Sequence, residues 1–354
     1  MNEKNVISLI DKLHREKILK CDELLFLLSQ KENKFVMNYI SRQAQEVTEK
    51  YFGNKIYIRG LIEFSNFCKN NCFYCGIRKD NLNLERYRLS ADEIFECCEK
   101  GYNLGFRTFV LQSGEDLYFT DEKMVNIISR IKKKFSDCAL TLSIGEKSFD
   151  TYKKYFDAGA DRFLLRHETI NNLHYKKLHP DNMSLKNRVK CLYGLKKIGY
   201  QVGTGFMIGS PYQDLKNIVS DLLFIKKFEP EMIGIGPFIP HKETKFNNFR
   251  SGDLNLTLIL IAILRLMLPD RLIPATTALG TIDKNGREKG ILFGANVLMP
   301  NLSPVCVRKK YSLYDNKICT GEEAAECIVC LKNRLKKIAR EIVVCRGDFQ
   351  SVNK

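Results

Sequence analysis

Two patterns of hydrophobic residues alternate along most of the chain. From residue 55 onward, short apolar runs typical of buried strands are each followed by a longer segment with apolar residues three or four positions apart, as in a helix packed on a sheet. The predicted strands are 56–63, 108–111, 139–144, 162–165, 201–207, 232–235, 273–276 and 295–299. The predicted helices are 90–104, 121–134, 148–158, 185–198, 214–228, 254–268, 286–292 and 322–342. Eight strand–helix units predict an α/β fold, a complete (β/α)8 or TIM barrel, with a doubly wound open sheet as the alternative.

The first part of the chain differs because it contains only helical patterns. Apolar residues are spaced as in helices from Ile7 to Val47, but the segment is too short to build a core of its own. We therefore expect residues 1–54 to form an N-terminal helical cap, residues 55–345 to form the barrel, and residues 346–354 to form a tail.

Composition and charge narrow the class of protein. The chain has 354 residues, 44% of them hydrophobic. No apolar run reaches the roughly 18 residues that a membrane span needs. The net charge of +16 comes from scattered basic residues without a nucleic-acid-binding pattern, so we expect no nucleic-acid partner.

The 13 cysteines are unevenly clustered, which favours a reducing compartment with cluster ligation over a disulfide framework. Without a secretory signal at its start, we predict a cytoplasmic protein with no membrane partner.

The most informative segment follows the first predicted strand and holds Cys68, Cys72 and Cys75 in a C-x3-C-x2-C spacing. A structural zinc site normally needs four protein ligands, whereas iron–sulfur clusters are held by closely spaced thiolates. Three thiolates leave one iron with an open position at which a ligand can bind. Because the loop comes after the carboxyl end of a strand, it lies at the functional end of an α/β barrel. We predict that these three cysteines are metal ligands at the catalytic centre.

Segments after other predicted strands carry candidate binding residues. Ser113 and Gly114 form a small turn after the second strand, where a ligand can approach the backbone closely. Arg162 and Arg166 on the fourth strand are four residues apart, so both are expected on the same side of it. This pair either forms a structural ion pair with Glu168 or binds a carboxylate or other anionic substrate group.

Further polar residues favour an anion-binding site at the same end of the barrel. Thr276 and Thr277 end the seventh strand and offer hydroxyl and backbone donors, to which Thr141 on the third strand can add another. Met299 and Tyr314 come after the eighth strand and either line the cavity or pack it. We predict these residues to be substrate contacts, together with Arg162 and Arg166.

A second group of cysteines lies near the end of the chain. Cys319, Cys327 and Cys330 have a C-x7-C-x2-C spacing that does not match a zinc finger. Zinc remains possible with Cys306 as a fourth ligand. We favour a second iron–sulfur cluster, for which the spacing gives no chemical role.

The first cysteine loop, with the aromatic Tyr74 before its last cysteine, resembles the signature of radical S-adenosylmethionine (SAM) enzymes. In that family the three cysteines bind a [4Fe–4S] cluster whose open iron is chelated by the amino and carboxylate groups of SAM. The resemblance implies that the turn at Gln112–Asp116 and Glu168 receive the amino group, and that Arg188 receives the carboxylate. The cofactor contacts implied in this way are Tyr74, Ser113, Gly114, Glu115, Glu168 and Arg188.

Within this class the chain resembles one family, the [FeFe]-hydrogenase maturase HydE. The resemblance runs in order over about residues 55–340 and rests on the cysteine loop, Gln112–Asp116, Leu165–Thr169, Gly234–His241 and Pro274–Thr277. It implies a complete barrel with a closed internal cavity. It also implies that Cys319, Cys327 and Cys330 hold a [2Fe–2S] or [4Fe–4S] cluster that is not the catalytic one.

The family's activity gives a functional expectation for this chain. Such enzymes use a low-potential electron donor to cleave SAM reductively to a 5′-deoxyadenosyl radical. The radical acts on a small cysteine-bound iron carbonyl cyanide complex made by the partner maturase HydG. The product passes to the GTPase HydF, a step in the assembly of the hydrogenase H-cluster under anaerobic conditions.

Two rival interpretations remain. A methylornithine synthase, which rearranges lysine in a similar barrel, is not expected to carry the C-terminal cysteine trio. A non-catalytic iron–sulfur scaffold would bind clusters without cleaving SAM. Residue chemistry alone does not distinguish a cysteine-bound iron complex from a plain amino acid as the substrate.

Overall fold

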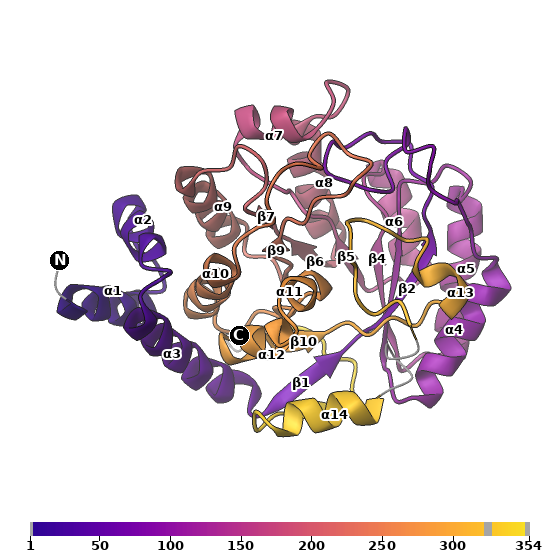
Figure 1. The fold of residues 1–354 in the computed structure, drawn as a ribbon. Coiled ribbons are helices and arrows are strands. Elements are labelled where there is room, and N and C mark those ends of the chain that lie inside the picture. Colours follow the sequence, from indigo (N-terminus) through magenta and orange to yellow (C-terminus); the bar gives the residue numbers. More distant parts are fainter. Residues whose placement is uncertain (1–2, 322–327, 351–354) are drawn as a thin grey trace.

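The computed structural model of the protein describes residues 3–321 and 328–350. Helices surround a group of parallel strands, with the loop after β2 near the top of the view and α14 at the bottom (Figure 1). None of the described helices combines the length and apolar character needed to span a bilayer.

The central sheet contains six parallel strands in the order β2, β3, β4, β5, β6, β8. Strand order therefore follows chain order, as it does when each strand is joined to the next by a helix on the outside. The strands are β2 (Gly60–Ser65), β3 (Thr108–Ser113), β4 (Ala139–Ser143), β5 (Arg162–Leu164), β6 (Gln201–Thr204) and β8 (Met232–Ile233). This parallel α/β architecture agrees with the fold class expected from the sequence.

Two smaller groups of parallel strands accompany the central sheet. The first has the order β10, β1, β11 and the second pairs β7 with β9. These strands are β1 (Lys55–Ile58), β7 (Met207–Ile208), β9 (Gly236–Pro237), β10 (Val297–Leu298) and β11 (Glu341–Val343). Because β1 runs into β2 after a single residue, the first predicted strand joins the two groups.

Isolated parallel bridges continue the pairing beyond the regular strands. Met232 pairs with Leu272, Pro274 pairs with Val297, and Leu61 pairs with Asn301. The prediction of a regular strand at 273–276 was wrong, because only single bridges form there and Pro274 has no N–H to donate to a ladder. The predicted helix 322–342 was also wrong at its end, where Glu341–Val343 pairs with β1 as strand β11.

The helices that follow β2 agree closely with the apolar periodicity. Those that were predicted are α4 (Ala91–Asn103), α5 (Asp121–Lys134), α6 (Phe149–Asp157), α8 (Leu185–Ile198), α9 (Leu215–Phe228), α10 (Leu254–Met267), α12 (Gly286–Leu292) and α14 (Ile328–Lys336). Three short helices were not predicted, namely α7 (Asn172–Leu178), α11 (Thr277–Ile282) and α13 (Val305–Arg308). Helix α4 begins with a capping box, in which Ser90 and Glu93 exchange hydrogen bonds.

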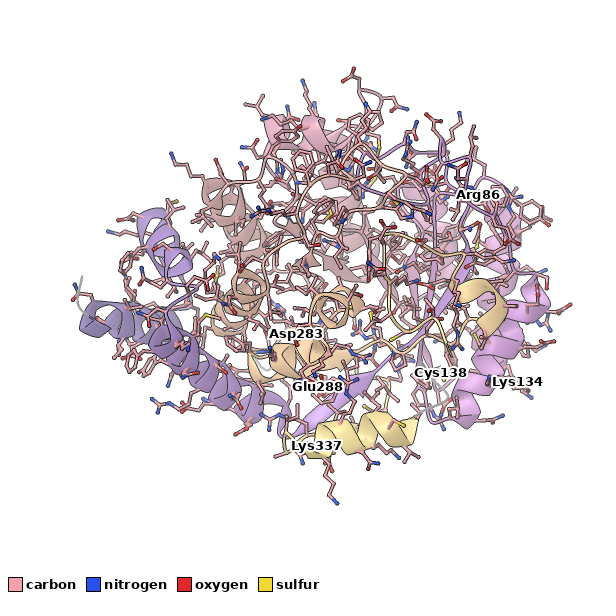
Figure 2. All side chains as sticks on the ribbon, viewed as in Figure 1. Arg86, Lys134, Cys138, Asp283, Glu288 and Lys337 are labelled. Atoms are coloured by element: carbon pink, nitrogen blue, oxygen red, sulfur yellow. The ribbon has the colours of Figure 1, made fainter. Side chains whose placement is uncertain are left out.

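The N-terminal helices lie against one side of the strand–helix region. They are α1 (Glu3–Glu16), α2 (Cys21–Ser29) and α3 (Lys34–Phe52), and α3 packs along α10 (Figure 1). Every residue of α10 from Leu256 to Met267 is buried, including Arg265, whose guanidinium donates to the carbonyl oxygens of Gly294, Pro269 and Arg271. Side chains fill the space between these elements (Figure 2).

Candidate active site

The three cysteines of the first loop line one cavity of about 320 Å³ at the carboxyl ends of the strands. The loop after β2 has little regular structure and is fixed by backbone hydrogen bonds to distant segments. Lys69 N donates to Glu115 O at 3.0 Å, Phe73 N to Leu178 O at 3.0 Å, and Gly76 N to Leu313 O at 2.9 Å. These contacts hold Cys68, Cys72 and Cys75 around a common space.

The chemistry of the three thiols fits a metal cluster. Burial raises the pKa of all three, that of Cys75 to about 12, and the neighbouring thiols add to the effect at Cys72. Ligation of a cation therefore has to displace protons from thiols that are otherwise neutral. The backbone N–H groups of Asn70 and Glu115 both donate to Cys68 Sγ at 3.4 Å, a contact that stabilises a ligating thiolate.

The fit to a metal cluster rests on the chemical identity of the three thiol ligands, and not on a preformed site for one metal ion. Among residues 3–321 and 328–350, no three His, Cys, Asp or Glu side chains are arranged closely enough to hold a single metal ion. A multi-iron cluster is larger than one ion, and each of its irons needs only one of these thiolates. Cys68, Cys72 and Cys75 would be its ligands.

The turn after β3 forms one wall of the cavity. Ser113, Gly114 and Glu115 all line it. A Cβ atom on Gly114 would lie 2.2 Å from Phe67 O, so only glycine fits between this turn and the cysteine loop. The buried Glu115 carboxylate accepts from Glu146 N at 3.0 Å and pairs with Lys69 Nζ at 3.1 Å.

A charged group from the region after β5 also lines the cavity. Arg166, Glu168 and Arg188 line the cavity, and Arg166 Nη2 lies 3.1 Å from Glu168 Oε2. Arg188 donates to Arg166 O at 3.0 Å and pairs with Glu146 at 2.5 Å. Glu168 has a φ of 64°, a backbone conformation that costs free energy outside glycine and recurs at functional sites.

Several polar atoms of this cavity are buried without a hydrogen-bond partner in the described part of the chain. They are Arg166 Nε and Nη2, Glu168 Oε2 and Thr276 Oγ1. Although Arg166 and Glu168 are close enough to attract each other, their geometry does not satisfy these atoms. Because buried polar groups are normally hydrogen-bonded, these atoms indicate a polar ligand with both acceptor and donor groups. The amino acid part of SAM has this character, so the residues present fit the cofactor.

Two tyrosines among the predicted residues also line the cavity. Tyr74 Oη lies 3.2 Å from His179 Nε2, and the His179 ring stacks on Tyr175 with centroids 3.9 Å apart. Burial lowers the pKa of His179 to about 3, so this histidine is a neutral partner for Tyr74. Tyr314 lines the cavity from the segment after α13, and Thr276 lines it from the start of α11.

Four of the predicted substrate residues do not line the cavity: Thr141, Arg162, Thr277 and Met299. Thr141 is buried within β4 and its hydroxyl has no hydrogen-bond partner among the described residues. Thr277 is the first residue of α11, while Met299 packs against a cluster of Met232, Leu272 and Val297.

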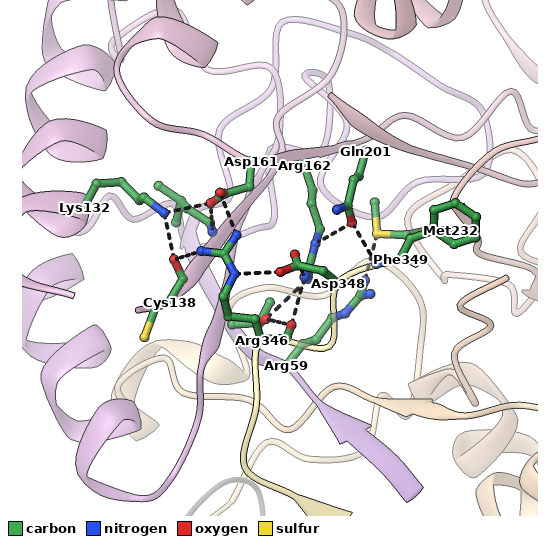
Figure 3. Close-up of polar contacts among 12 residues, drawn as sticks. Arg59, Lys132, Cys138, Asp161, Arg162, Gln201, Met232, Arg346, Asp348 and Phe349 are labelled. Carbon is green, nitrogen blue, oxygen red and sulfur yellow. Dashed lines mark hydrogen bonds and ion pairs between the residues drawn. The ribbon is translucent and has the colours of Figure 1, made fainter. Parts of the chain in front are cut away.

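Arg162 lies at the amino end of the strands, whereas Arg166 follows the carboxyl end of β5. Its guanidinium pairs with Asp348 at 2.6 Å and donates to Arg346 O at 2.8 Å and Gln201 Oε1 at 3.2 Å (Figure 3). The even spacing of Arg162 and Arg166 predicted the side of the strand on which they lie, but not their positions along the strand axis. Arg162 begins β5 and Arg166 follows its end, so about 13 Å of extended chain separates the two residues.

Sequence reasoning missed Gly145 and Glu146, which follow β4. Gly145 lines the cavity with a φ of 75°, and a Cβ atom there would lie 2.1 Å from Glu115 Cγ. Glu146 fixes the guanidinium of Arg188, as described above. A glycine directly after a predicted strand was the available signal, since the same signal identified Gly114.

The second cysteine group is only partly described. Cys319 is buried with a φ of 62°, and Arg287 Nη1 lies 3.7 Å from its sulfur. Cys330 is on α14 and is disulfide-bonded, so cluster ligation by this residue requires its reduction. Cys327 lies outside the described residues. The second cluster therefore stays a prediction.

Comparison with known proteins defines the class first. The radical SAM superfamily profile matches residues 62–225, which run from β2 into α9 and contain the cysteine loop. The fold agrees, because the crystal structure of methylornithine synthase (PylB) superposes with a TM-score of 0.82 over 95% of this chain and 97% of that chain, at 28% identity. A crystal structure of the maturase HydG shares the fold, with a TM-score of 0.81, at 20% identity, over 98% of this chain and 77% of that one. The protein is a radical SAM enzyme.

Sequence relatives then define the family. The [FeFe] hydrogenase maturase subunit HydE of Thermotoga maritima is 47% identical over 298 residues, which are 84% of this chain and 85% of that protein. The 3-methylornithine synthase of Methanosarcina barkeri is 30% identical over 98% of this chain and 96% of its own length. The chain belongs to the HydE family.

Proposed function

We propose that this enzyme acts in the assembly of the [FeFe]-hydrogenase H-cluster, where it transforms a small cysteine-bound iron carbonyl cyanide complex. One observation carries the proposal. A single cavity is lined by three thiols and by the unpartnered polar atoms of Arg166, Glu168 and Thr276. The 47% identity to a HydE, against 30% to methylornithine synthases, favours the maturase substrate over lysine.

The cofactors follow from the class of enzyme. When bound, a [4Fe–4S] cluster and SAM together supply a 5′-deoxyadenosyl radical after one-electron reduction. Cys68, Cys72 and Cys75 would hold the cluster. Glu168 and the Ser113–Glu115 turn would bind the amino group of SAM. Arg188, held in place by Glu146, would bind its carboxylate.

The remaining cavity residues would bind and orient the substrate. Arg166 and Thr276 offer unpartnered donors to an anionic group, and Tyr314 closes the cavity beside them. We leave Thr141, Arg162, Thr277 and Met299 out of this set because they do not line the cavity. Keeping water away from a reactive radical would be the protein's main contribution besides orientation.

The finer architecture belongs to the same proposal. We infer that the parallel strands form a complete (β/α)8 barrel, because the bridges at Leu272, Pro274 and Asn301 continue the pairing from β8 to β10 and β2. Residues 1–54 would be its helical cap and 55–345 its barrel region. Further proposals are a second iron–sulfur cluster at Cys319, Cys327 and Cys330, the partners HydG and HydF, and a location in the reducing cytoplasm.

The test is an anaerobic turnover assay on the reconstituted enzyme with dithionite and SAM. 5′-Deoxyadenosine is quantified alone, with the iron–cysteine dicarbonyl cyanide complex, and with L-lysine. We expect the iron complex to be consumed and to stimulate SAM cleavage. Conversion of lysine would instead identify a methylornithine synthase, and cluster content without any cleavage would identify a scaffold.

Two threonine variants test whether the response to the iron complex depends on the cavity. Thr276→Val removes the unpartnered hydroxyl without changing the volume of the side chain, and should weaken the response to the iron complex by about tenfold. The matched control is Thr48→Val in α3, since Thr48 Oγ1 already donates to Ala44 O at 2.7 Å. Equal effects of the two variants would contradict the assignment of the cavity.

A further inference from the structure

The cysteine loop is an excursion of the chain that leaves β2 and returns beside it. Ser65, the last residue of β2, forms an antiparallel bridge with Arg88, and Leu89 N donates to Phe64 O at 2.8 Å. The segment between these contacts therefore leaves the carboxyl end of β2 and comes back to the same point. Arg86 lies on the returning part, just before the bridge (Figure 2).

The guanidinium of Arg86 joins the two ends of this loop. Its terminal nitrogens Nη1 and Nη2 donate to five backbone carbonyl oxygens at distances of 2.5–3.4 Å, those of Asn66, Ile77, Arg78, Lys79 and Asn81. The first of these carbonyl groups precedes Cys68 and the other four follow Cys75. One side chain thus connects the start and the end of the segment that carries all three cysteines.

No carboxylate shares this guanidinium. Arg86 forms no ion pair with any residue in 3–321 or 328–350, so its positive charge is balanced only by the oxygen ends of the carbonyl dipoles. Burial lowers the pKa of Arg86, while the nearby Cys68 and Cys75 act in the opposite direction. Without a cation between them, the converging carbonyl oxygens would repel one another, and the loop would open.

The shape of the arginine side chain suits this arrangement better than that of lysine. A guanidinium holds its N–H donors in a rigid plane and can serve acceptors on two sides, whereas an ammonium group has three donors on one atom. None of the five hydrogen bonds uses a cysteine side chain. They can therefore form whether or not a ligand is bound to the thiols.

We propose that Arg86 is a positioning residue, which holds Cys68, Cys72 and Cys75 in their ligating arrangement before the iron–sulfur cluster arrives. The inference rests on the proposed function, because that function assigns the cluster to these three cysteines. A loop that is already ordered loses little conformational entropy when the cluster binds, so uptake of the cluster becomes faster and tighter.

The test compares Arg86→Ala with Arg107→Ala in the full-length protein. Arg107 is a matched control because it is also half-buried and donates to two carbonyl oxygens, those of Tyr102 and Phe106. It directly precedes β3 and so lies at the amino end of the strands, opposite the cysteine loop.

Two properties are measured on protein prepared anaerobically without its cluster. Hydrogen–deuterium exchange reports on the amide groups that are hydrogen-bonded in the loop, including those of Phe73, Gly76 and Lys79. The rate of [4Fe–4S] uptake after addition of iron and sulfide is followed from the visible absorbance of the cluster.

We expect Arg86→Ala to accelerate exchange within residues 66–81 but not in the rest of the chain, and to slow cluster uptake by roughly tenfold. Methylguanidine, added well below denaturing concentrations, should restore uptake because it supplies the missing donors. Methylammonium supplies charge alone and should not restore it. Arg107→Ala should match the wild type in both measurements.

A second variant keeps the test decisive if the alanine variant does not fold. Arg86→Lys retains the charge but not the planar donors, and should slow uptake by about threefold. Exchange and uptake in the Arg86 variant equal to those of Arg107→Ala would overturn the role of Arg86, as would equal restoration by methylammonium. A wild-type protein that takes up no [4Fe–4S] cluster would instead overturn the proposed function.

Discussion

Gly114 illustrates how one missing side chain brings two parts of the site together. The backbone of the β3 turn contacts the backbone of the cysteine loop at Phe67 and the side chain of Cys68 at distances that exclude a Cβ atom. The same approach lets Glu115 N donate to Cys68 Sγ. The glycine therefore sets both the position of a proposed cluster ligand and the shape of the proposed SAM site.

Gly114→Ala should separate the turn from the loop. We expect SAM affinity to fall by at least about tenfold, and the free energy of unfolding to fall by about 1–3 kcal/mol, because the added methyl group overpacks a rigid contact. Equilibrium dialysis with SAM and urea denaturation measure the two effects. The matched control is Gly194→Ala in α8, where the new Cβ would lie 3.5 Å from its nearest neighbour and should be neutral or stabilising. Wild-type affinity in the Gly114 variant would contradict this role.

At the same scale, the sequence predicted the chemical type of the site better than its exact contacts. The cysteine loop, the Ser113–Glu115 turn, Arg166, Glu168, Arg188 and Thr276 all line one cavity. Arg162 was placed with Arg166 because residue spacing along a strand indicates direction but contains no measure of depth. The bond partners of Arg162, Asp348 above all, come from a segment that no local pattern connects to β5.

The segment that follows β11 is the element that occupies the amino end of the strands. Arg346 bridges Asp348 at 2.7 Å and Asp161 at 2.9 Å, while Asp348 also binds the fully buried Arg162 (Figure 3). Burial alone raises the pKa of the Asp348 carboxyl, but Arg346 and Arg162 outweigh it and hold this pKa below its ordinary value of 3.8. The residues expected to form a tail are thus bound to the barrel strands at least as far as Phe349, whose N–H donates to Gln201 at 3.1 Å.

Asp348→Asn should destabilise the protein at neutral pH by about 3 kcal/mol, because it leaves the buried Arg162 without its anion. A carboxyl whose pKa is lower in the folded state stabilises the fold above its unfolded pKa, and this contribution is lost as the pH falls through the folded value. The difference between the two proteins should therefore shrink below pH 4. Urea denaturation from pH 3 to pH 7 measures it, and a difference that does not depend on pH would exclude the ion pair as the cause.

Element boundaries were predicted well where the signal was local. The apolar periodicity gave α5 and α8 at their observed bounds, because a helix satisfies its hydrogen bonds within one segment. Pairing with β1 turned Glu341–Val343 into a strand that the helical periodicity did not predict. Such pairing depends on residues far away in the sequence, and a window of neighbouring residues contains no information about it.

At the scale of the whole molecule, the N-terminal helices complete the hydrophobic core of the barrel region. α3 packs along α10, a helix whose residues are buried on all sides from Leu256 to Met267. Without α3, the apolar surface of α10 would face water. On this basis we propose that the N-terminal helices are a cap and not an independently folding domain.

Ile40→Asp tests this dependence. Ile40 is fully buried in α3, and a carboxylate there would lose its hydration, so we expect a loss of more than about 4 kcal/mol of stability or a failure to fold. Soluble yield and thermal unfolding by circular dichroism measure the effect. Arg42→Asp, two residues away on the exposed face, is the control and should change stability by about 0.5 kcal/mol or less. A stable, active Ile40 variant would show that the barrel region does not need the cap.

The pairing of β1 has a consequence for how the protein is made. β1 is flanked by β10 and β11, two strands from the far end of the sequence, and it runs directly into the strand that precedes the cysteine loop. During synthesis on the ribosome, Lys55–Ile58 therefore emerges long before β10 and β11 have been synthesised. Until then the backbone hydrogen-bonding groups on both edges of β1 remain unpaired. The cysteine loop can reach its final position only when the last strands have arrived. Delivery of iron and sulfide to the new enzyme should accordingly be a late event, after release of the finished chain.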